Sequence, residues 1–163
     1  MSSLNIDGRI LALDLGTKRV GVAVTDESRI ALRDLPALPR TNWKNLLEAI
    51  RKSCQRFDAA AVVVGLPLRL DSSEGSAAAD ARRIASNLSL SLKIPIFLQD
   101  EKLTSVAAEE LLQLERVSDI KARVDSRAAS IILADFILRL SDGSDMRQIG
   151  NFDESFENLN IKP

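Results

Sequence analysis

The sequence of 163 residues predicts an α/β fold, a mixed sheet of five strands flanked by helices. Three short β-rich segments come first, and two later apolar segments alternate with segments of helical period. Strands that follow one another closely pair antiparallel, whereas strands separated by helices pair parallel. We therefore expect one domain over residues 1–140, which is long enough for a single hydrophobic core.

The first three strands are expected at residues 9–14, at residues 20–25 and around residues 30–32. The first two segments are rich in aliphatic and β-branched residues. Residues 26–28, Asp-Glu-Ser, are typical of a turn and precede the third segment. These three strands should form an antiparallel meander.

A helix and a buried strand follow the meander. Thr41 is a candidate cap for this helix. Its apolar residues recur every three or four positions and are Trp43, Leu47, Ile50, Cys54 and Phe57. Residues 59–64 form a continuous apolar run, which is typical of a strand buried on both faces. The segment from Gly65 to Leu68 is interpreted as the terminator of that strand.

The second half of the chain predicts three helices and one more strand. A helix is expected from about residue 75 to residue 90, and residues 94–98 form a short apolar strand. Thr104 is placed to cap the next helix, and residues 124–140 form the last one. The second helix should bury Ala77, Ala81, Ile84, Ala85 and Leu88.

Residues 141–163 are expected to be a weakly ordered acidic tail, because they hold five acidic and two basic residues without a regular apolar period. No apolar run approaches the roughly 20 residues that cross a bilayer. A single cysteine, Cys54, fits a reducing compartment. We therefore expect a cytoplasmic protein that does not bind membranes.

Carboxylates follow the predicted parallel strands. Asp14 ends the first strand, Asp100 and Glu101 follow the strand at residues 94–98, and Asp125 begins the last helix. The carboxyl ends of parallel strands meet at one edge of a sheet, and carboxylates gathered there repel one another without a cation. Because the chain has no histidine, oxygen ligands favour Mg²⁺ or Mn²⁺, the ions that assist phosphodiester hydrolysis.

Simpler interpretations remain open from spacing alone. Asp14 is compatible with an ordinary turn and Asp125 with a helix cap, and spacing does not decide between Asp100 and Glu101. Basic residues near the same edge are candidates for binding the phosphates of a nucleic acid. They are Lys18, Arg19, Arg69, Lys102 and Arg123.

Four segments resemble the motifs of the YqgF/RuvX family, in the order found in that family: residues 11–26, 62–75, 100–112 and 121–138. The resemblance implies an RNase H-like fold and a metal-dependent nuclease for the 5′ end of pre-16S rRNA in ribosome biogenesis. Some relatives are instead described as Holliday junction resolvases. The resemblance to the family also implies that Asp14, Glu101 and Asp125 form the catalytic and metal-binding triad.

Two functions of other classes remain as alternatives. The Asp-Leu-Gly-Thr segment at residues 14–17 also resembles the phosphate loop of actin-like ATPases, but those enzymes close two such domains over the nucleotide. The second alternative is a catalytically silent module that binds ribosomal or transcription components. The expected partners are precursor rRNA, the ribosomal subunit or branched DNA. The protein is expected to be a monomer or a homodimer, and a junction resolvase should be a dimer because it cuts two strands symmetrically.

Overall fold

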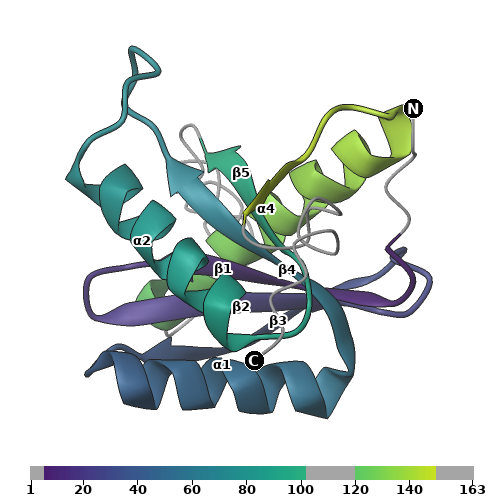
Figure 1. Ribbon diagram of the computed structural model, residues 1–163, viewed down its shortest axis with the longest axis horizontal. Helices are drawn as coiled ribbons and strands as arrows, with labels where there is room; N and C mark the ends of the chain where they lie inside the picture. The colour runs from purple at the N-terminus through teal and green to yellow at the C-terminus, as the bar shows by residue number, and fades with distance from the viewer. Residues whose placement is uncertain (1–5, 102–119, 150–163) are drawn as a thin grey trace, which may run out of the picture.

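The computed structural model describes residues 6–101 and 120–149, with the side chains of residues 120–125 outside the description. One six-stranded sheet in the order β3-β2-β1-β4-β5-β6 forms its centre (Figure 1). The first three strands are β1 (Arg9–Leu15), β2 (Arg19–Thr25) and β3 (Leu32–Pro39). The other three are β4 (Ala59–Pro67), β5 (Ile96–Glu101) and β6 (Arg147–Ile149). The mixed sheet confirms the predicted fold class, with one strand more than predicted.

The antiparallel meander of β1, β2 and β3 is confirmed, but β3 begins later than predicted. The residues before it are used in a turn around Asp26, whose Oδ1 accepts hydrogen bonds from the backbone nitrogens of Ile30 at 2.8 Å and Ala31 at 3.2 Å. Ile30 is 85% exposed rather than part of a strand. β3 contains Pro36. Proline is tolerated in this strand because β3 lies at the edge of the sheet, where a missing N–H donor can face away from the neighbouring strand.

The parallel part of the sheet consists of β1, β4 and β5, with β4 between the other two. β4 does not end before Gly65, as the sequence suggested, but continues to Pro67, and Leu66 is fully buried. β5 likewise runs further than predicted and includes both Asp100 and Glu101. The acidic residues of this edge therefore lie within the sheet and not in loops beyond it.

The helices form two layers, one on each face of the sheet (Figure 1). α1 (Trp43–Phe57) and α2 (Ser76–Ser91) cover one face, and α4 (Ile120–Asp142) covers the other. Asn42, not Thr41, caps α1, because its side chain accepts a hydrogen bond from the Asn45 nitrogen at 2.8 Å. α2 buries Ala78 in place of the predicted Ala77. The predicted helix after Thr104 lies outside the described residues.

Part of the predicted acidic tail is structured. Asp142 ends α4, and residues 147–149 form β6, which pairs antiparallel with β5. The rest of that segment, from residue 150, lies outside the description. Within the described residues, none of the helices has the length and apolarity needed to traverse a bilayer.

Candidate active site

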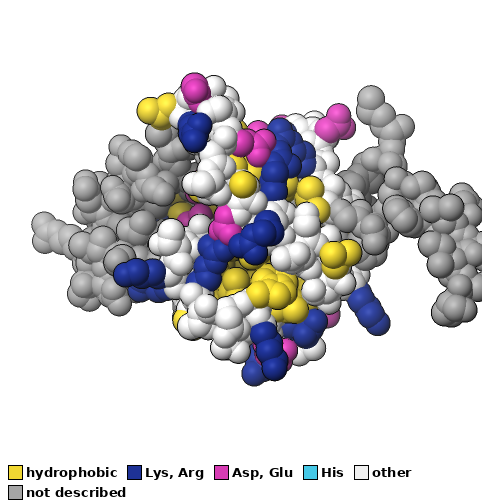
Figure 2. Space-filling model, turned by 60° about the vertical axis from the view of Figure 1, so that its left-hand side comes forward, with side chains coloured by type: hydrophobic (Ala, Val, Ile, Leu, Met, Phe, Trp, Pro, Cys, Tyr) yellow, Lys and Arg dark blue, Asp and Glu magenta, His cyan; other side chains and the backbone are white. Residues whose placement is uncertain are grey.

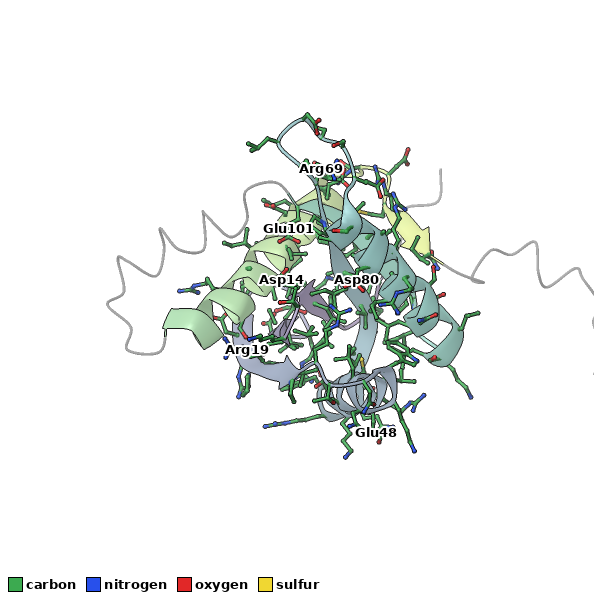
Figure 3. All side chains as sticks on the ribbon, turned by 90° about the vertical axis from the view of Figure 1, so that its left-hand side faces the viewer. Asp14, Arg19, Glu48, Arg69, Asp80 and Glu101 are labelled. Atoms are coloured by element: carbon green, nitrogen blue, oxygen red, sulfur yellow. The ribbon has the colours of Figure 1, made fainter. Side chains whose placement is uncertain are left out.

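Asp14 and Glu101 approach each other across the middle strand of the parallel part of the sheet. Asp14 lies in β1 and Glu101 ends β5, with β4 between them. Side chains alternate between the faces of a strand, and Ala12 and Phe97 belong to the core beneath α4. Asp14 and Glu101, two and four residues further along, therefore point to the same face, and Figure 3 shows them side by side.

Gly65 occupies the corresponding position of β4, two residues after Val63 of the same core. A Cβ atom added to Gly65 would lie 2.5 Å from Glu101 Oε2 and 2.5 Å from Ile132 Cδ1. Both distances are far shorter than a van der Waals contact. Gly65 is therefore not the strand terminator suggested by the sequence, and it occupies a place where a carboxylate and α4 approach the backbone.

The two carboxyl groups are electrostatically coupled. Burial, followed by the negative charge of Asp14 and a hydrogen bond with Asp14, raises the pKa of Glu101 to about 8. At neutral pH the pair therefore retains a proton, which relieves the repulsion between two adjacent carboxylates. A cation bound between them would relieve the same repulsion.

The structure also separates Glu101 from Asp100, a distinction that spacing alone left open. Alternation along β5 places Asp100 on the opposite face from Glu101. Asp100 Oδ1 lies 3.2 Å from a guanidinium nitrogen of Arg147 in β6. Only Glu101 of this adjacent pair reaches Asp14.

Asp125 lies inside α4, five residues after its first residue, so it is not the N-terminal cap considered above. Its side chain is outside the description. Across residues 6–101 and 126–149, whose side chains are described, no three groups of the Asp, Glu, Cys or His types gather as a metal site. The described part of the acidic site is thus the pair of Asp14 and Glu101.

The position of α4 over the sheet is fixed by polar contacts with β3. Ser126 Oγ donates a hydrogen bond to the Leu35 carbonyl at 2.6 Å, and Ser130 Oγ donates to the carboxylate of Asp34. Arg127 forms an ion pair with the same carboxylate at 3.7 Å. These contacts hold the N-terminal half of α4 in register with the meander.

The predicted basic residues are spread around this edge. Lys18 is exposed in the turn between β1 and β2, and Arg19 begins β2, on the same side of the molecule as Asp14 in Figure 3. Arg69 is exposed in the loop after β4, near the end of the strand. Lys102 lies outside the described residues, as does the side chain of Arg123. Figure 2 shows basic side chains interspersed with acidic ones on the face of the molecule that it presents.

Arg40 is a supporting residue that the sequence did not reveal. Its guanidinium donates to the Gly16 carbonyl at 2.9 Å and to the Asp80 carboxylate at 2.7 Å, and its backbone nitrogen donates to the Lys18 carbonyl. Burial tends to raise the pKa of Asp80, but hydrogen bonds from Arg40 and Arg83 outweigh it and lower that pKa. Arg40 thus fixes the turn that follows Asp14. Its partners are 24 and 40 residues away, so local sequence carries no signal of the contact.

Comparison with known proteins agrees with this architecture. A family model described as "RuvX: Holliday junction resolvase" matches residues 8–139. Two relatives bear the name "Putative pre-16S rRNA nuclease". The relative from Syntrophus aciditrophicus (strain SB) is 39% identical over 135 residues, covering 82% of this chain and 90% of its own length. The relative from Chloroflexus aurantiacus (strain ATCC 29366 / DSM 635 / J-10-fl) is 41% identical over 133 residues, covering 80% of this chain and 87% of its own length.

Two solved structures share the fold. The chain in "T. thermophilus RuvC in complex with Holliday junction substrate" aligns with a TM-score of 0.52 at 11% identity, covering 87% of this chain and 99% of that one. The chain in "Thermus thermophilus RuvC structure" aligns with a TM-score of 0.53 at 12% identity, covering 86% of this chain and 99% of that one. These likenesses confirm the expected RNase H-like fold, and at such identities they show the fold alone.

Proposed function

The chain belongs to the RuvX family, and on that basis we propose that it is a metal-dependent endonuclease that hydrolyses phosphodiesters in structured RNA. The observation that carries the proposal is the coupled pair of Asp14 and Glu101 at the carboxyl edge of the parallel strands. Its proposed substrate is the 5′ end of pre-16S rRNA, the RNA in the name of its relatives, and its proposed location is the cytoplasm.

Asp14 and Glu101 would hold Mg²⁺ or Mn²⁺, and Asp125 would complete the site. The donor set fits a hard cation, since both described groups present carboxylate oxygens and share a proton that a cation can replace. Asp125 precedes Ala129 by one helical turn and Ile132 by about two, and both residues pack on the face that carries the acidic pair. This spacing supports a role for Asp125 in the same site.

When bound, the cation supplies Lewis-acid stabilisation of the charge that develops on the phosphodiester. The residues of the chain have distinct tasks around it. Glu101 must release its proton before it can act as a ligand. Lys18, Arg19 and Arg69 would orient the phosphate backbone, with Lys102 and Arg123 in the same proposed role. Arg40 keeps the turn after Asp14 in place.

Branched DNA is the second candidate substrate, because the matching family model is described as a Holliday junction resolvase. A resolvase makes two symmetric cuts and should act as a homodimer. A ribosomal subunit is the corresponding partner for the rRNA-processing function. Substrate preference and oligomeric state therefore separate the two activities.

A cleavage assay tests the proposal. Purified protein is incubated with a precursor 16S rRNA fragment and, separately, with a four-way DNA junction, each with Mg²⁺, Mn²⁺ or EDTA. We expect cleavage of the RNA that needs the cation and is lost in Asp14→Asn and Glu101→Gln. Glu48→Gln is the matched control, because Glu48 lies on α1 away from the acidic pair (Figure 3). Cleavage of the junction alone would favour the resolvase, and cation-independent cleavage that survives both substitutions would refute the proposed site.

A further inference from the structure

We infer that Gly65 is a positioning residue for the acidic pair: the missing side chain on β4 is what lets the Glu101 carboxylate lie against the sheet and reach Asp14. The consequence for cation binding rests on the proposed function. The contact itself is a property of the metal-free protein and is testable without that function. Gly65 affects the proposed cation site only through the position of the Glu101 carboxylate.

Backbone conformation does not explain why this position is a glycine. The glycines of the described residues with a left-handed φ are Gly8 and Gly143, and Gly65 is not among them. Its backbone is that of an ordinary strand residue of β4, which lies between β1 and β5, and it pairs with Gln99 of β5. Glycine weakens a strand interior, because it has the most conformational freedom to lose on folding. The space left by the missing Cβ is therefore the property that distinguishes glycine here.

Two neighbours use that space, and each supports a different explanation. Glu101 Oε2 and Ile132 Cδ1 both lie 2.5 Å from the site of an added Cβ. If only Ile132 mattered, Gly65 would serve the packing of α4 on the sheet. If Glu101 matters, Gly65 sets the position of an acidic side chain. Ile132→Val separates the two, because it deletes Cδ1 and leaves Cγ1, which lies at 3.4 Å.

The first experiment measures the melting temperature of the metal-free protein in a mutant cycle. Gly65→Ala is introduced into an Ile132→Val background, with and without Glu101→Ala. We expect a clear loss of melting temperature with Glu101 present and a smaller loss without it, because the added methyl group then meets no carboxylate. An equal loss in both backgrounds would show that Gly65 does not make room for Glu101 and would overturn the inference.

The second experiment measures Mn²⁺ affinity by electron paramagnetic resonance in the wild type, Ile132→Val, Gly65→Ala and the double variant Gly65→Ala/Ile132→Val. We expect Ile132→Val to bind like the wild type. The double variant should have a higher melting temperature than Gly65→Ala. It should still bind Mn²⁺ about 10- to 100-fold more weakly than the wild type, as when a group that orients metal ligands is disturbed. Wild-type affinity in the double variant would overturn the positioning role. Absence of Mn²⁺ binding by the wild type would refute the proposed function, and the mutant cycle alone would then decide the contact.

A separate observation supports a second inference, about the end of the sheet opposite the acidic pair. Here a pocket of about 380 Å³ is lined by residues that include Arg9 of β1, Arg33 of β3, and Arg56 and Phe57 of α1. We call it the arginine pocket and propose that it binds the phosphate group of a nucleotide or of an RNA strand. Arg9 and Asp14 are five residues apart on one strand, roughly 17 Å, so the arginine pocket is distinct from the acidic site.

The charges of the arginine pocket are poorly balanced by acidic groups. Its one acidic lining residue, Asp26, is engaged by Ser28 and by the backbone nitrogens of the turn. Arg9 lies 4.0 Å from Glu27, whose side chain is 81% exposed, a pairing that contributes little. Among the described residues, Arg33 and Arg56 have no carboxylate partner within ion-pair distance. A concave site with this excess of guanidinium groups favours an anion.

Phe57 organises these arginines. The guanidinium carbons of Arg33 and Arg56 lie 5.9 Å and 5.2 Å from the centre of its ring, within the range of cation–π contacts. Arg9 donates a hydrogen bond to the Phe57 carbonyl at 3.2 Å. The three guanidinium groups are thus held around one residue, and arginine binds phosphate through paired N–H donors.

Binding is tested by calorimetry in EDTA, at low and high salt, with inorganic phosphate, adenosine monophosphate and a single-stranded RNA hexamer. Arg33→Gln and Arg56→Gln are compared with Lys44→Gln, which removes the same charge from an exposed position on α1. We expect both arginine variants to bind about 10-fold more weakly and Lys44→Gln to match the wild type. Affinity for the monophosphate would identify a nucleotide as the ligand, whereas affinity for the RNA alone would identify a strand. If the arginine variants match Lys44→Gln with every probe, the arginine pocket is not a phosphate site.

Discussion

Arg147 of β6 forms an ion pair with Asp100 of β5 at 3.2 Å, one residue before Glu101. A segment from beyond the last helix is thereby joined to the strand that carries half of the acidic pair. The contact pairs the charge of Asp100 on the face of β5 opposite to Glu101. β6 also covers the edge of β5, which would otherwise expose unpaired backbone groups.

Truncation after Asp142 should therefore destabilise the domain. It removes β6, its backbone hydrogen bonds to β5 and the ion pair with Asp100. We expect a melting temperature several degrees lower, which corresponds to about 1–2 kcal/mol in a domain of this size. Truncation after Ile149 is the matched control because it retains β6. Equal melting temperatures for the two truncated proteins would show that β6 contributes nothing to stability.

Asp14→Asn should abolish cleavage without unfolding the protein. The substitution keeps the shape of the side chain, and the amide can still hydrogen-bond to the protonated Glu101, so the free energy of unfolding of the metal-free protein should be nearly unchanged. Turnover should fall by at least about 100-fold, because a ligand of the cation is lost. Thermal unfolding and RNA cleavage are measured on the same preparation. Wild-type turnover with Mg²⁺ would exclude Asp14 from the site.

Asp125→Asn tests the third acid of the proposed triad. Since Asp125 lies inside α4 and does not cap it, the neutral amide should leave the melting temperature nearly unchanged. Cleavage and Mn²⁺ affinity should both fall if the carboxylate is a ligand. Retention of both properties would limit the site to Asp14 and Glu101.

The stability of the metal-free protein should fall as the pH rises toward 8. The pKa of Glu101 is raised from 4.5 to about 8 in the folded state, so between these values the folded protein binds more protons than the unfolded chain. This contribution to stability is complete below pH 4.5 and is lost as the pH passes through about 8. Melting temperatures measured across this range without metal should therefore decline, and Glu101→Gln should decline less. Identical slopes for the two proteins would contradict the proton held by the pair.

Cation affinity should change in the opposite direction. A proton on Glu101 competes with the metal, so the affinity for Mn²⁺ should increase as the pH rises to about 8 and then level off. Calorimetric titrations between pH 6 and pH 9 measure this directly. An affinity that does not depend on pH would show that Glu101 is not a ligand.

Much of the fold follows from sequence periodicity, and the differences have local causes. Apolar patterns mark two strands and one helix, at residues 9–15, 19–25 and 43–57. β3 was predicted too early because the hydrogen bonds of Asp26 extend the turn through Ala31. β6 was missed because a three-residue edge strand depends on pairing with β5, which no local pattern reveals.

The site was predictable in part. The positions of Asp14 and Glu101 follow from strand ends and from the family resemblance, and the structure brings the two together. The role of Gly65 could not be inferred, because glycine after an apolar run is usually a strand end, and only the tertiary approach of Glu101 and Ile132 explains it. Arg40 was missed for the same reason, since its acceptors Gly16 and Asp80 are remote in sequence.

The central claim is that Asp14 and Glu101 together hold a divalent cation. A crystal structure of the protein grown with Mn²⁺, with anomalous diffraction recorded, tests this claim most directly. We predict an anomalous peak in contact with both carboxylates, absent in crystals of Asp14→Asn grown in the same way. Crystals of the wild type in which the two carboxyl groups remain hydrogen-bonded to each other, with no peak beside them at saturating Mn²⁺, would contradict it.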